Sequence, residues 1–370
     1  MKTRSEDRNE RKGLVGVWVL SVMVLSSILF VILPARPVEG GRRKAPPKPA
    51  ADAGVTALPL PGATPDGVML DYLAVDRARH RVWVPAGGTG NTVVIDTKTQ
   101  EIRRVEKFPT KEVERRGTKR MVGPSSATIG DGVVYVGNRG DSSVCAVDAT
   151  TLARGGCVTL SAMPDGLAFV SSRKEVWATT PHEQTITVLD VSTPTAPKLA
   201  GSIKLDGAPE GYAVDDGRGS FYTNLEDKDR TLRIDVSTRQ VNATWMPTCG
   251  VDGPKGLAFE PQGRLLMVAC SDHVEVLDAN ADGHILSKLA TGEGVDNLDY
   301  LPERRLLYVA AGAAATLTVA HLDEKGVLKG TASAPTAKGA RNAVVDEHGV
   351  AYVADGPEGK ILVVRPAKDK

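Results

Sequence analysis

Short apolar stretches with alternating polar positions recur along most of the chain from Val55 onward. In the first copy, the segments LDYLAVD, RVWVPAG, NTVVIDT and IRRVEKF are each rich in β-branched residues and bounded by turn-forming residues. Such segments predict β-strands, and four in succession predict an antiparallel meander. In six copies the third segment ends in an aspartate, whose carboxylate can bond the backbone two residues on and fix a hairpin turn. These aspartates are Asp96, Asp148, Asp190, Asp235, Asp278 and Asp323.

The same pattern occurs seven times, and the apolar cores of successive copies are 54, 40, 45, 45, 41 and 45 residues apart. Repeats of 40 to 45 residues with several short strands each are typical of propeller blades. We therefore predict an all-β, seven-bladed β-propeller of four-stranded blades over residues 55–366, followed by a tail at 367–370. The last copy lacks an outer strand, and VTALPLP at residues 55–61 can supply it. Closing the ring in this way would remove open sheet edges.

A stretch of 21 residues without charge, Gly13 to Leu33, precedes the repeats. As a helix rising about 1.5 Å per residue, it would span roughly the 30 Å hydrocarbon layer of a membrane. It is longer than the apolar region of a cleaved signal peptide, and Leu33-Pro34-Ala35 is a poor cleavage site, so we predict an uncleaved transmembrane signal-anchor over residues 13–34. Basic residues lie on both sides, so the positive-inside rule does not choose the orientation. The prolines of residues 35–54 predict an extended linker, and residues 1–12 would be a cytoplasmic tail.

The four cysteines fall into two pairs. Cys145 and Cys157 are about one hairpin apart in the second copy. Cys249 lies in the loop leading into the fifth copy and Cys270 ends that copy's second strand, two places that share one face of a propeller. We predict two disulfides, which favour an oxidising compartment; the alternative is four buried, inert thiols. With disulfides, the protein would be a single-pass protein of the cytoplasmic (inner) membrane with its propeller on the extracytoplasmic side.

Two segments, VPAGGTGNTVVIDTKTQEI and VYVGNRGDSSVCAVDATTL, resemble the YVTN repeat, and DYLAVDRARHRVWV resembles a blade of the YncE-like propellers of bacteria. The resemblance covers about residues 55–366. It implies an extracytoplasmic seven-bladed propeller, often without a defined catalytic activity, and some members of the family bind nucleic acid or partner proteins. Repeats of this kind serve many functions, so the resemblance indicates fold rather than activity.

Charge and composition narrow the choice of partner. The chain has 46 Lys and Arg against 45 Asp and Glu, and a net charge of +1 produces no field that attracts nucleic acid. Aromatic residues make up only 4% of the chain, which leaves few rings for stacking bases or sugars. We therefore expect a monomeric propeller that binds a protein or a small polar ligand, and that contacts the membrane through its N-terminal helix.

A tight turn precedes each inner strand, as in MPDG, APEG and GPKG, and places one variable residue per blade at the mouth of the central channel. A rigid scaffold that presents polar groups around one axis suits a ligand site. The predicted ligand-binding residues are the seven residues at these positions and two neighbouring amides, namely Asp71, Ser125, Asp165, Glu210, Lys255, Asp296, Asn297, Arg341 and Asn342.

Two interpretations of these residues stay open. Glu210, Asp296 and Asn342 carry oxygens that suit a divalent cation, the one cofactor that the pattern suggests. Alternatively, opposite charges neutralise one another around a water-filled channel. Related seven-bladed folds include lactonases with a metal held by Glu, Asn and Asp, so a metal-assisted lactonase-like hydrolase is the alternative function. No catalytic residue is assigned, because none of the six histidines falls in the ring. The sequence favours a membrane-anchored binding module over an enzyme.

Two loop features add little. The segment FPTKEVERRGTKRMVG at residues 108–123 explains the long first spacing, and as a basic flap it could contact anionic lipid or a partner, although such runs are usually solvated. The tripeptide Arg139-Gly140-Asp141 matches an integrin motif by chance, and we attach no function to it.

Overall fold

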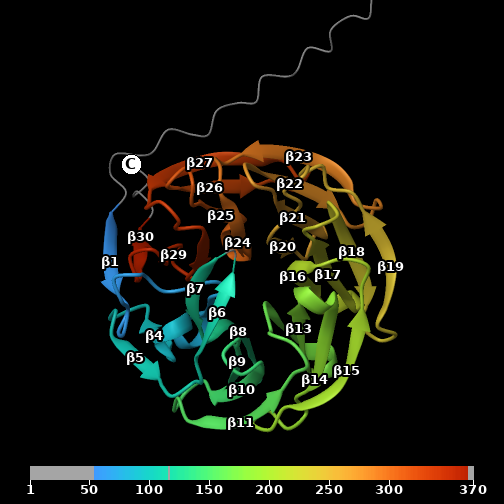
Figure 1. Ribbon diagram of the computed structural model, residues 1–370. Helices are drawn as coiled ribbons and strands as arrows, with labels where there is room; N and C mark the ends of the chain where they lie inside the picture. Colours follow the sequence, from blue (N-terminus) through green and yellow to red (C-terminus); the bar gives the residue numbers. More distant parts are fainter. Residues whose placement is uncertain (1–53, 116, 366–370) are drawn as a thin grey trace, which may run out of the picture. The chain divides into compact units, whose positions relative to one another are not determined.

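The computed structural model describes residues 54–115 and 117–365. Within this region, seven four-stranded antiparallel sheets stand around a central axis (Figure 1), which confirms the predicted seven-bladed propeller. The predicted tail (1–12), membrane anchor (13–34), linker up to residue 53 and C-terminal tail (367–370) lie outside the described residues. In the described part of the chain, no helix is both long enough and apolar enough to cross a membrane.

Each blade is a meander, and in blades 1 to 6 the strands follow one another outward from the axis in chain order. The strands of blades 1 to 3 are β2 (Ala74–Asp76), β3 (Arg81–Pro85), β4 (Thr92–Asp96), β5 (Ile102–Val105); β8 (Pro124–Gly130), β9 (Val133–Asn138), β10 (Ser143–Asp148), β11 (Arg154–Thr159); β12 (Leu167–Val170), β13 (Glu175–Thr180), β14 (Thr185–Asp190) and β15 (Lys198–Lys204). Those of blades 4 to 6 are β16 (Pro209–Asp215), β17 (Ser220–Leu225), β18 (Arg230–Asp235), β19 (Gln240–Trp245); β20 (Leu257–Glu260), β21 (Leu265–Ala269), β22 (His273–Asp278), β23 (His284–Ala290); β24 (Val295–Leu301), β25 (Leu306–Ala311), β26 (Thr316–Leu322) and β27 (Leu328–Pro335).

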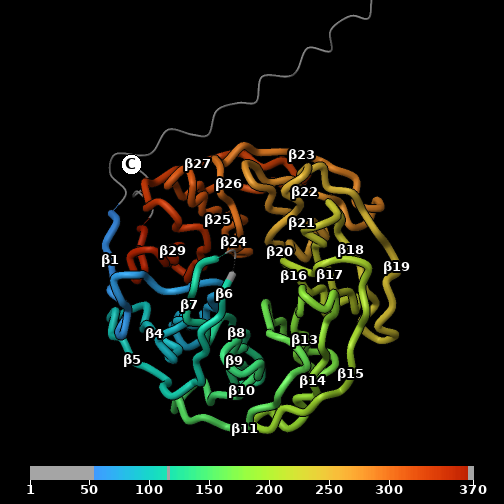
Figure 2. The backbone as a smooth tube through the Cα atoms, viewed as in Figure 1, coloured from blue at the N-terminus to red at the C-terminus, as the bar shows by residue number. Residues whose placement is uncertain are grey.

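Blade 7 joins the two ends of the propeller. Its strands are β28 (Asn342–Val345), β29 (Ala351–Asp355), β30 (Lys360–Val364) and, at the outer edge, β1 (Val55–Pro59). β1 pairs with β30 from Val55 opposite Val364 to Pro59 opposite Lys360, and Figure 2 shows the blue N-terminal strand beside the red C-terminal blade. The prediction that residues 55–61 close the ring is therefore confirmed.

Turns and short 3-10 helices connect the strands. The 3-10 helices are η1 (Arg77–Arg79), η2 (Gly87–Thr89), η3 (Ser171–Arg173), η4 (Pro181–Glu183), η5 (Asp216–Arg218) and η6 (Pro302–Arg304). All six aspartates that end a third strand accept a hydrogen bond from the backbone N–H two residues on, as the sequence predicts. Residues 108–123 contain a separate hairpin, β6 (Lys111–Arg115) and β7 (Thr118–Val122), which lies in front of the ring in Figure 1.

The hydrophobic core is divided into seven layers, one between each pair of neighbouring blades. Fully buried Trp83 of blade 1 packs against Val134 and Val136 of blade 2, and Trp177 of blade 3 packs in the layer shared with blade 4. Burying both faces of every sheet explains why the middle strands are continuous apolar runs rather than strictly alternating ones. The stability of each blade therefore depends on its two neighbours.

Both predicted disulfides are present. Cys145 and Cys157 lie opposite each other on β10 and β11 and are bonded. Cys249, in the loop leading into blade 5, is bonded to Cys270, directly after β21. The first bond cross-links one hairpin of blade 2, and the second cross-links two loops of blade 5.

Candidate functional site

The nine predicted ligand-binding residues are called the ring residues below. Glycines that follow two of them allow the inner strands to lie close together at one end of the axis. A Cβ added to Gly211, next to Glu210, would lie 2.3 Å from the carbonyl oxygen of Lys255. A Cβ on Gly256, next to Lys255, would lie 2.4 Å from Oδ1 of Asn297. No real Cβ is accommodated at such distances, so the turns of neighbouring blades pack backbone against backbone only because these positions are glycine. The Glu-Gly and Lys-Gly pairs of the sequence thus hold the ring side chains close to one another.

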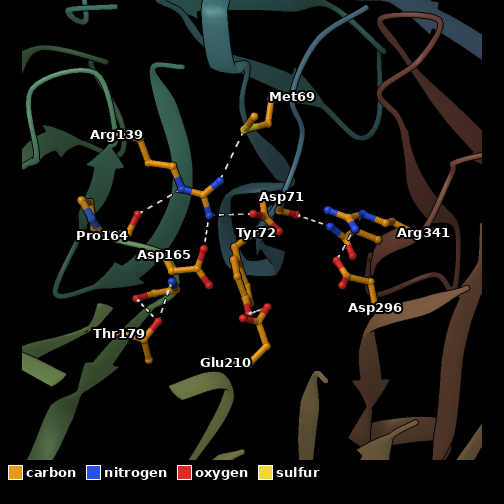
Figure 3. A network of polar contacts seen from close by, with 12 residues as sticks. Met69, Asp71, Tyr72, Arg139, Pro164, Asp165, Thr179, Glu210, Asp296 and Arg341 are labelled. Atoms are coloured by element: carbon orange, nitrogen blue, oxygen red, sulfur yellow. Dashed lines mark hydrogen bonds and ion pairs between the residues drawn. The ribbon is translucent and has the colours of Figure 1, made fainter. Parts of the chain in front are cut away.

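Arg139 connects two ring carboxylates (Figure 3). Its Nη2 lies 2.8 Å from Oδ2 of Asp71 and also contacts Oδ1 of Asp165. Nε donates to the carbonyl of Pro164 at 3.3 Å, so the guanidinium is held from three sides. Arg139 follows β9, and its N–H donates to the carbonyl of Gly123 at 2.9 Å, which fixes this loop beside the start of blade 2's inner strand.

Tyr72 lies between the carboxylates of opposite blades. Its hydroxyl donates to Oε1 of Glu210 at 3.1 Å (Figure 3), and its ring stacks on that of Tyr212 with 5.6 Å between centroids. Its N–H donates to the carbonyl of Ser125, which anchors it to blade 2. The middle of the ring is therefore occupied by an aromatic side chain whose polar end faces an acid.

The other ring residues make more local contacts. Nε of Arg341 lies 3.3 Å from Oδ2 of Asp296, and Nδ2 of Asn342 donates to the carbonyl oxygen of Asp71 at 2.9 Å. Lys255 pairs instead with Glu226, a residue outside the predicted set, at 2.9 Å. Asn297 uses its Oδ1 to accept a hydrogen bond from the N–H of the next residue.

Burial and crowding raise the pKa of three ring carboxyl groups. Burial, together with the charges of Asp71 and Asp296, raises the pKa of Asp165 to about 7 even though Arg139 opposes the change. Burial and the neighbouring acids, Asp165 first, hold the pKa of Glu210 well above its ordinary value. The pKa of Asp296 is also raised by burial, despite the favourable charge of Arg341. Burial and mutual repulsion thus oppose the simultaneous ionisation of these carboxyl groups.

Several buried polar atoms of the ring have no partner among the residues that the structure describes. They are Oγ of Ser125, Oδ2 of Asp165 and Oδ1 of Asn342. Ser125 is 1% exposed and Asn342 2% exposed, and Asp165 is 9% exposed. A buried acceptor without a donor is costly, and a donor that reached one of these oxygens would relieve that cost.

The structure brings most, but not all, of the predicted residues into one network. Asp71, Asp165 and Glu210 are linked through Arg139 and Tyr72, whereas Lys255 pairs with Glu226. The sequence analysis missed Arg139, Tyr72 and Glu226. Arg139 and Glu226 each follow the second strand of a blade, on the loops that we used to place Cys270, so the same reasoning could have found them.

Two of the three proposed metal ligands contact other side chains, since Glu210 accepts from Tyr72 and Asp296 faces Arg341. Asn342 donates its Nδ2 to a backbone carbonyl, whereas its Oδ1, the atom that could bind a metal, has no partner among the described residues. Among the described residues, the group of three His, Cys, Asp or Glu side chains whose ligand atoms lie within 4.8 Å of one another is Cys270, His273 and Glu275, in blade 5. The proposal of a divalent cation at the ring stays a prediction.

No family model matches the sequence, and no curated protein sequence does. Several solved structures are similar to this chain. A chain in the crystal structure of a mitotic checkpoint complex aligns with a TM-score of 0.67 and 14% identity, covering 94% of this chain and 100% of that chain. A chain of hydrazine synthase from Kuenenia stuttgartiensis aligns with a TM-score of 0.68 and 14% identity, covering 83% of this chain and 98% of that chain. At this identity the likeness shows the propeller fold alone, and the resemblance to YncE-like proteins stays a prediction.

Proposed function

We propose that this protein is a binding module that takes a small organic cation, such as a protonated amine or a guanidinium group, at the ring of Asp71, Asp165, Glu210 and Asp296. The observation that carries the proposal is Oδ2 of Asp165, a buried carboxylate oxygen that accepts no hydrogen bond from the described chain. A ligand N–H would supply the missing donor, and a charge-assisted hydrogen bond is among the stronger polar contacts.

Electrostatics support a positive ligand over a neutral or negative one. The pKa of Asp165 is raised to about 7, mainly by burial, and the pKa of Glu210 is raised as well. A cation would stabilise the ionised forms of both groups, so binding would release protons. Affinity should therefore rise with pH through about 7. The stacked rings of Tyr72 and Tyr212 add aromatic surface that attracts cations.

An organic cation suits the ring better than a divalent metal ion does. A metal ion needs several oxygens at coordination distance, whereas the described ring residues form no group of three His, Cys, Asp or Glu side chains whose ligand atoms lie within 4.8 Å of one another. Hydrogen bonds from an ammonium or guanidinium group can instead be shared among carboxylates that lie further apart. The metal-assisted lactonase-like hydrolase would need such a group of ligands, and the described ring residues do not form one.

For the location, we propose that residues 13–34 anchor the chain in the cytoplasmic membrane, with a YncE-like propeller on the extracytoplasmic side. The uncharged run of 21 residues and the two disulfides support this proposal. A protein ligand would fit the proposal where a lysine or arginine side chain, or an amino terminus, enters the ring.

Thermal unfolding of the full-length protein tests the proposal. Methylammonium, agmatine and spermidine are added separately, and calcium, magnesium, manganese and zinc form a second series. A ligand of the folded state raises the midpoint by mass action. We expect a rise with at least one organic cation, larger at pH 8 than at pH 6, and lost in Asp165→Asn and in Glu210→Gln. The control Asp206→Asn, whose side chain is 60% exposed, should respond like the wild type.

Two outcomes would count against this function. A shift produced only by a metal ion and lost in the ring variants would favour the metal interpretation. If neither series changes the midpoint in the wild type, the ring does not bind small cations.

A further inference from the structure

A second cluster of chemically active side chains lies in blade 5, apart from the ring residues. The disulfide of Cys249 and Cys270 adjoins His273 and Glu275. The ligand atoms of Cys270, His273 and Glu275 all lie within 4.8 Å of one another. Cys270 and Glu275 are 0% exposed and His273 is 9% exposed, so the cluster is inside the protein.

The local fold explains why these residues meet. The N–H of Cys270 donates to the carbonyl of His273 at 2.9 Å, which closes the turn between β21 and β22. His273 and Glu275 are two residues apart on β22, and side chains at that spacing share one face of a strand. Cys249 is held from the other side, because its N–H donates to Oδ1 of Asp229 at 3.2 Å.

The histidine is oriented as in many metal sites. Nδ1 of His273 lies 2.5 Å from Oδ1 of Asp272, and Nε2 lies 3.2 Å from Oε1 of Glu275. In metalloproteins a carboxylate on one ring nitrogen commonly fixes the tautomer and aims the other nitrogen at the metal. Here the nitrogen opposite Asp272 points into the cluster.

We propose that reduction of the Cys249–Cys270 disulfide converts this cluster into a zinc site, with both cysteines and His273 as ligands and Glu275 as the fourth. A dithiol reductant would transfer two electrons and two protons to the disulfide, break the sulfur–sulfur bond and itself become a disulfide. Zinc would then bind the two thiolates as their protons are released. Two sulfurs, one nitrogen and one oxygen make a four-coordinate donor set of the kind that zinc prefers.

Lys288 competes with zinc for Glu275, the fourth ligand. Its Nζ lies 2.5 Å from Oε1 of Glu275 in the oxidised protein. The lysine side chain is 48% exposed, whereas Glu275 is fully buried, so the lysine can turn into solvent while the carboxylate stays. Thr248 also donates to Oε1 of Glu275 at 2.7 Å, which holds the carboxylate in place.

The other disulfide is a matched control within the same chain. Nη2 of Arg154 lies 3.7 Å from both Cys145 Sγ and Cys157 Sγ. A guanidinium in this position repels a metal cation, and among the described residues no histidine hydrogen-bonds to either sulfur. Reduction of this bond should therefore create no site.

Cobalt binding to the full-length protein tests the proposal. The protein is reduced with a phosphine, freed of reductant without air, and titrated with cobalt(II), whose thiolate complexes absorb in the near ultraviolet and visible. We expect one cobalt per chain in the reduced wild type, displaced by zinc, and no thiolate band in the oxidised protein. Cys145→Ser/Cys157→Ser should retain the site, and Cys249→Ser/Cys270→Ser should lose it. His273→Gln should weaken cobalt binding at least tenfold.

The cobalt spectra distinguish this zinc site from the cation site proposed at the ring. Asp165→Asn should leave cobalt binding unchanged, because it alters only the ring. Circular dichroism shows whether each variant is folded, and His273→Gln, which keeps all four cysteines, serves if the Cys249→Ser/Cys270→Ser variant does not fold. The proposal is overturned if the reduced wild type gives no thiolate band, or if the band persists at full affinity in His273→Gln.

Discussion

Tyr72 donates its hydroxyl hydrogen to Oε1 of Glu210 at 3.1 Å, although the two residues are 138 positions apart in the chain. Tyr72 leads into the inner strand of blade 1, and Glu210 is in the inner strand of blade 4. This contact across the axis joins blades that share no core layer. The ring residues of blades 1 and 4 are therefore joined directly across the axis.

Removing the Tyr72 hydroxyl should lower stability. Tyr72→Phe deletes the hydrogen bond to Glu210, and we expect the free energy of unfolding to fall by about 1 kcal/mol. The matched control is Tyr135→Phe, because the Tyr135 hydroxyl is buried and has no hydrogen-bond partner among the described residues. That substitution should be neutral or stabilising. Urea unfolding measures both, and equal losses in the two variants would contradict the role of the contact.

Arg139 should be the most sensitive position of the ring. Arg139→Met would leave the carboxylates of Asp71 and Asp165 buried beside each other without their cation. Breaking a buried ion pair in this way costs about 3 to 5 kcal/mol. The comparison is Arg230→Met, which removes a solvent-exposed pair with Asp206 and should cost under about 1 kcal/mol. Similar losses in urea unfolding for both variants would show that the buried pair has no special weight.

The sequence predicts where the ring residues lie around the axis better than it predicts which side chains contact one another. The repeat predicts Asp71, Asp165 and Glu210 in equivalent turns before the inner strands; the structure has Asp71 and Asp165 before β2 and β12, whereas Glu210 already lies within β16. The repeat carries no information on side-chain reach, so the bond between Tyr72 and Glu210 could not be predicted. The cysteines can be paired from the sequence because a disulfide demands two close partners, whereas Arg139 has no such obligate partner.

The carboxyl group of Asp165 should make stability depend on pH. An aspartate in an unfolded chain titrates near pH 3.9, whereas burial and the charges of Asp71 and Asp296, opposed by Arg139, raise the pKa of Asp165 to about 7 in the folded protein. Between these values the folded state holds a proton that the unfolded state has lost. The stabilisation from this group is therefore complete below about pH 4 and is lost as pH rises to about 7.

Urea unfolding of the wild type and of Asp165→Asn between pH 2 and pH 8 checks this dependence. The free energy of unfolding of the wild type minus that of Asp165→Asn should fall with rising pH between about 4 and 7 and then level off. Asp235→Asn is a control of opposite sign, because hydrogen bonds from Ser237 and Thr238 lower the pKa of Asp235 to about 2. The difference in the free energy of unfolding between the wild type and Asp235→Asn should shrink as pH falls from about 4 to 2. A flat difference for Asp165→Asn from pH 4 to 7 would refute the raised pKa.

Closure of the ring through β1 should depend on alternate residues of that strand. Leu60 N–H donates to the carbonyl of Gly359, and Arg365 N–H donates to that of Gly54, so residues 54 and 60 are in hydrogen-bonded pairs. Such pairs alternate along antiparallel strands, which directs the N–H of Thr56 toward Val363 and that of Ala57 away from β30. Pro59, at another outward position, is natural in an edge strand.

Proline substitutions at the two neighbouring positions separate these roles. Thr56→Pro removes a bond to β30 and should lower the free energy of unfolding by at least about 1 kcal/mol. It should also expose the edge of β30 and promote self-association, seen by size-exclusion chromatography. Ala57→Pro keeps the bonds to β30 and should remain monomeric with a smaller loss of stability. If Ala57→Pro were as damaging as Thr56→Pro, closure would depend on strand packing rather than on these hydrogen bonds, because of these two N–H groups only that of Thr56 faces blade 7.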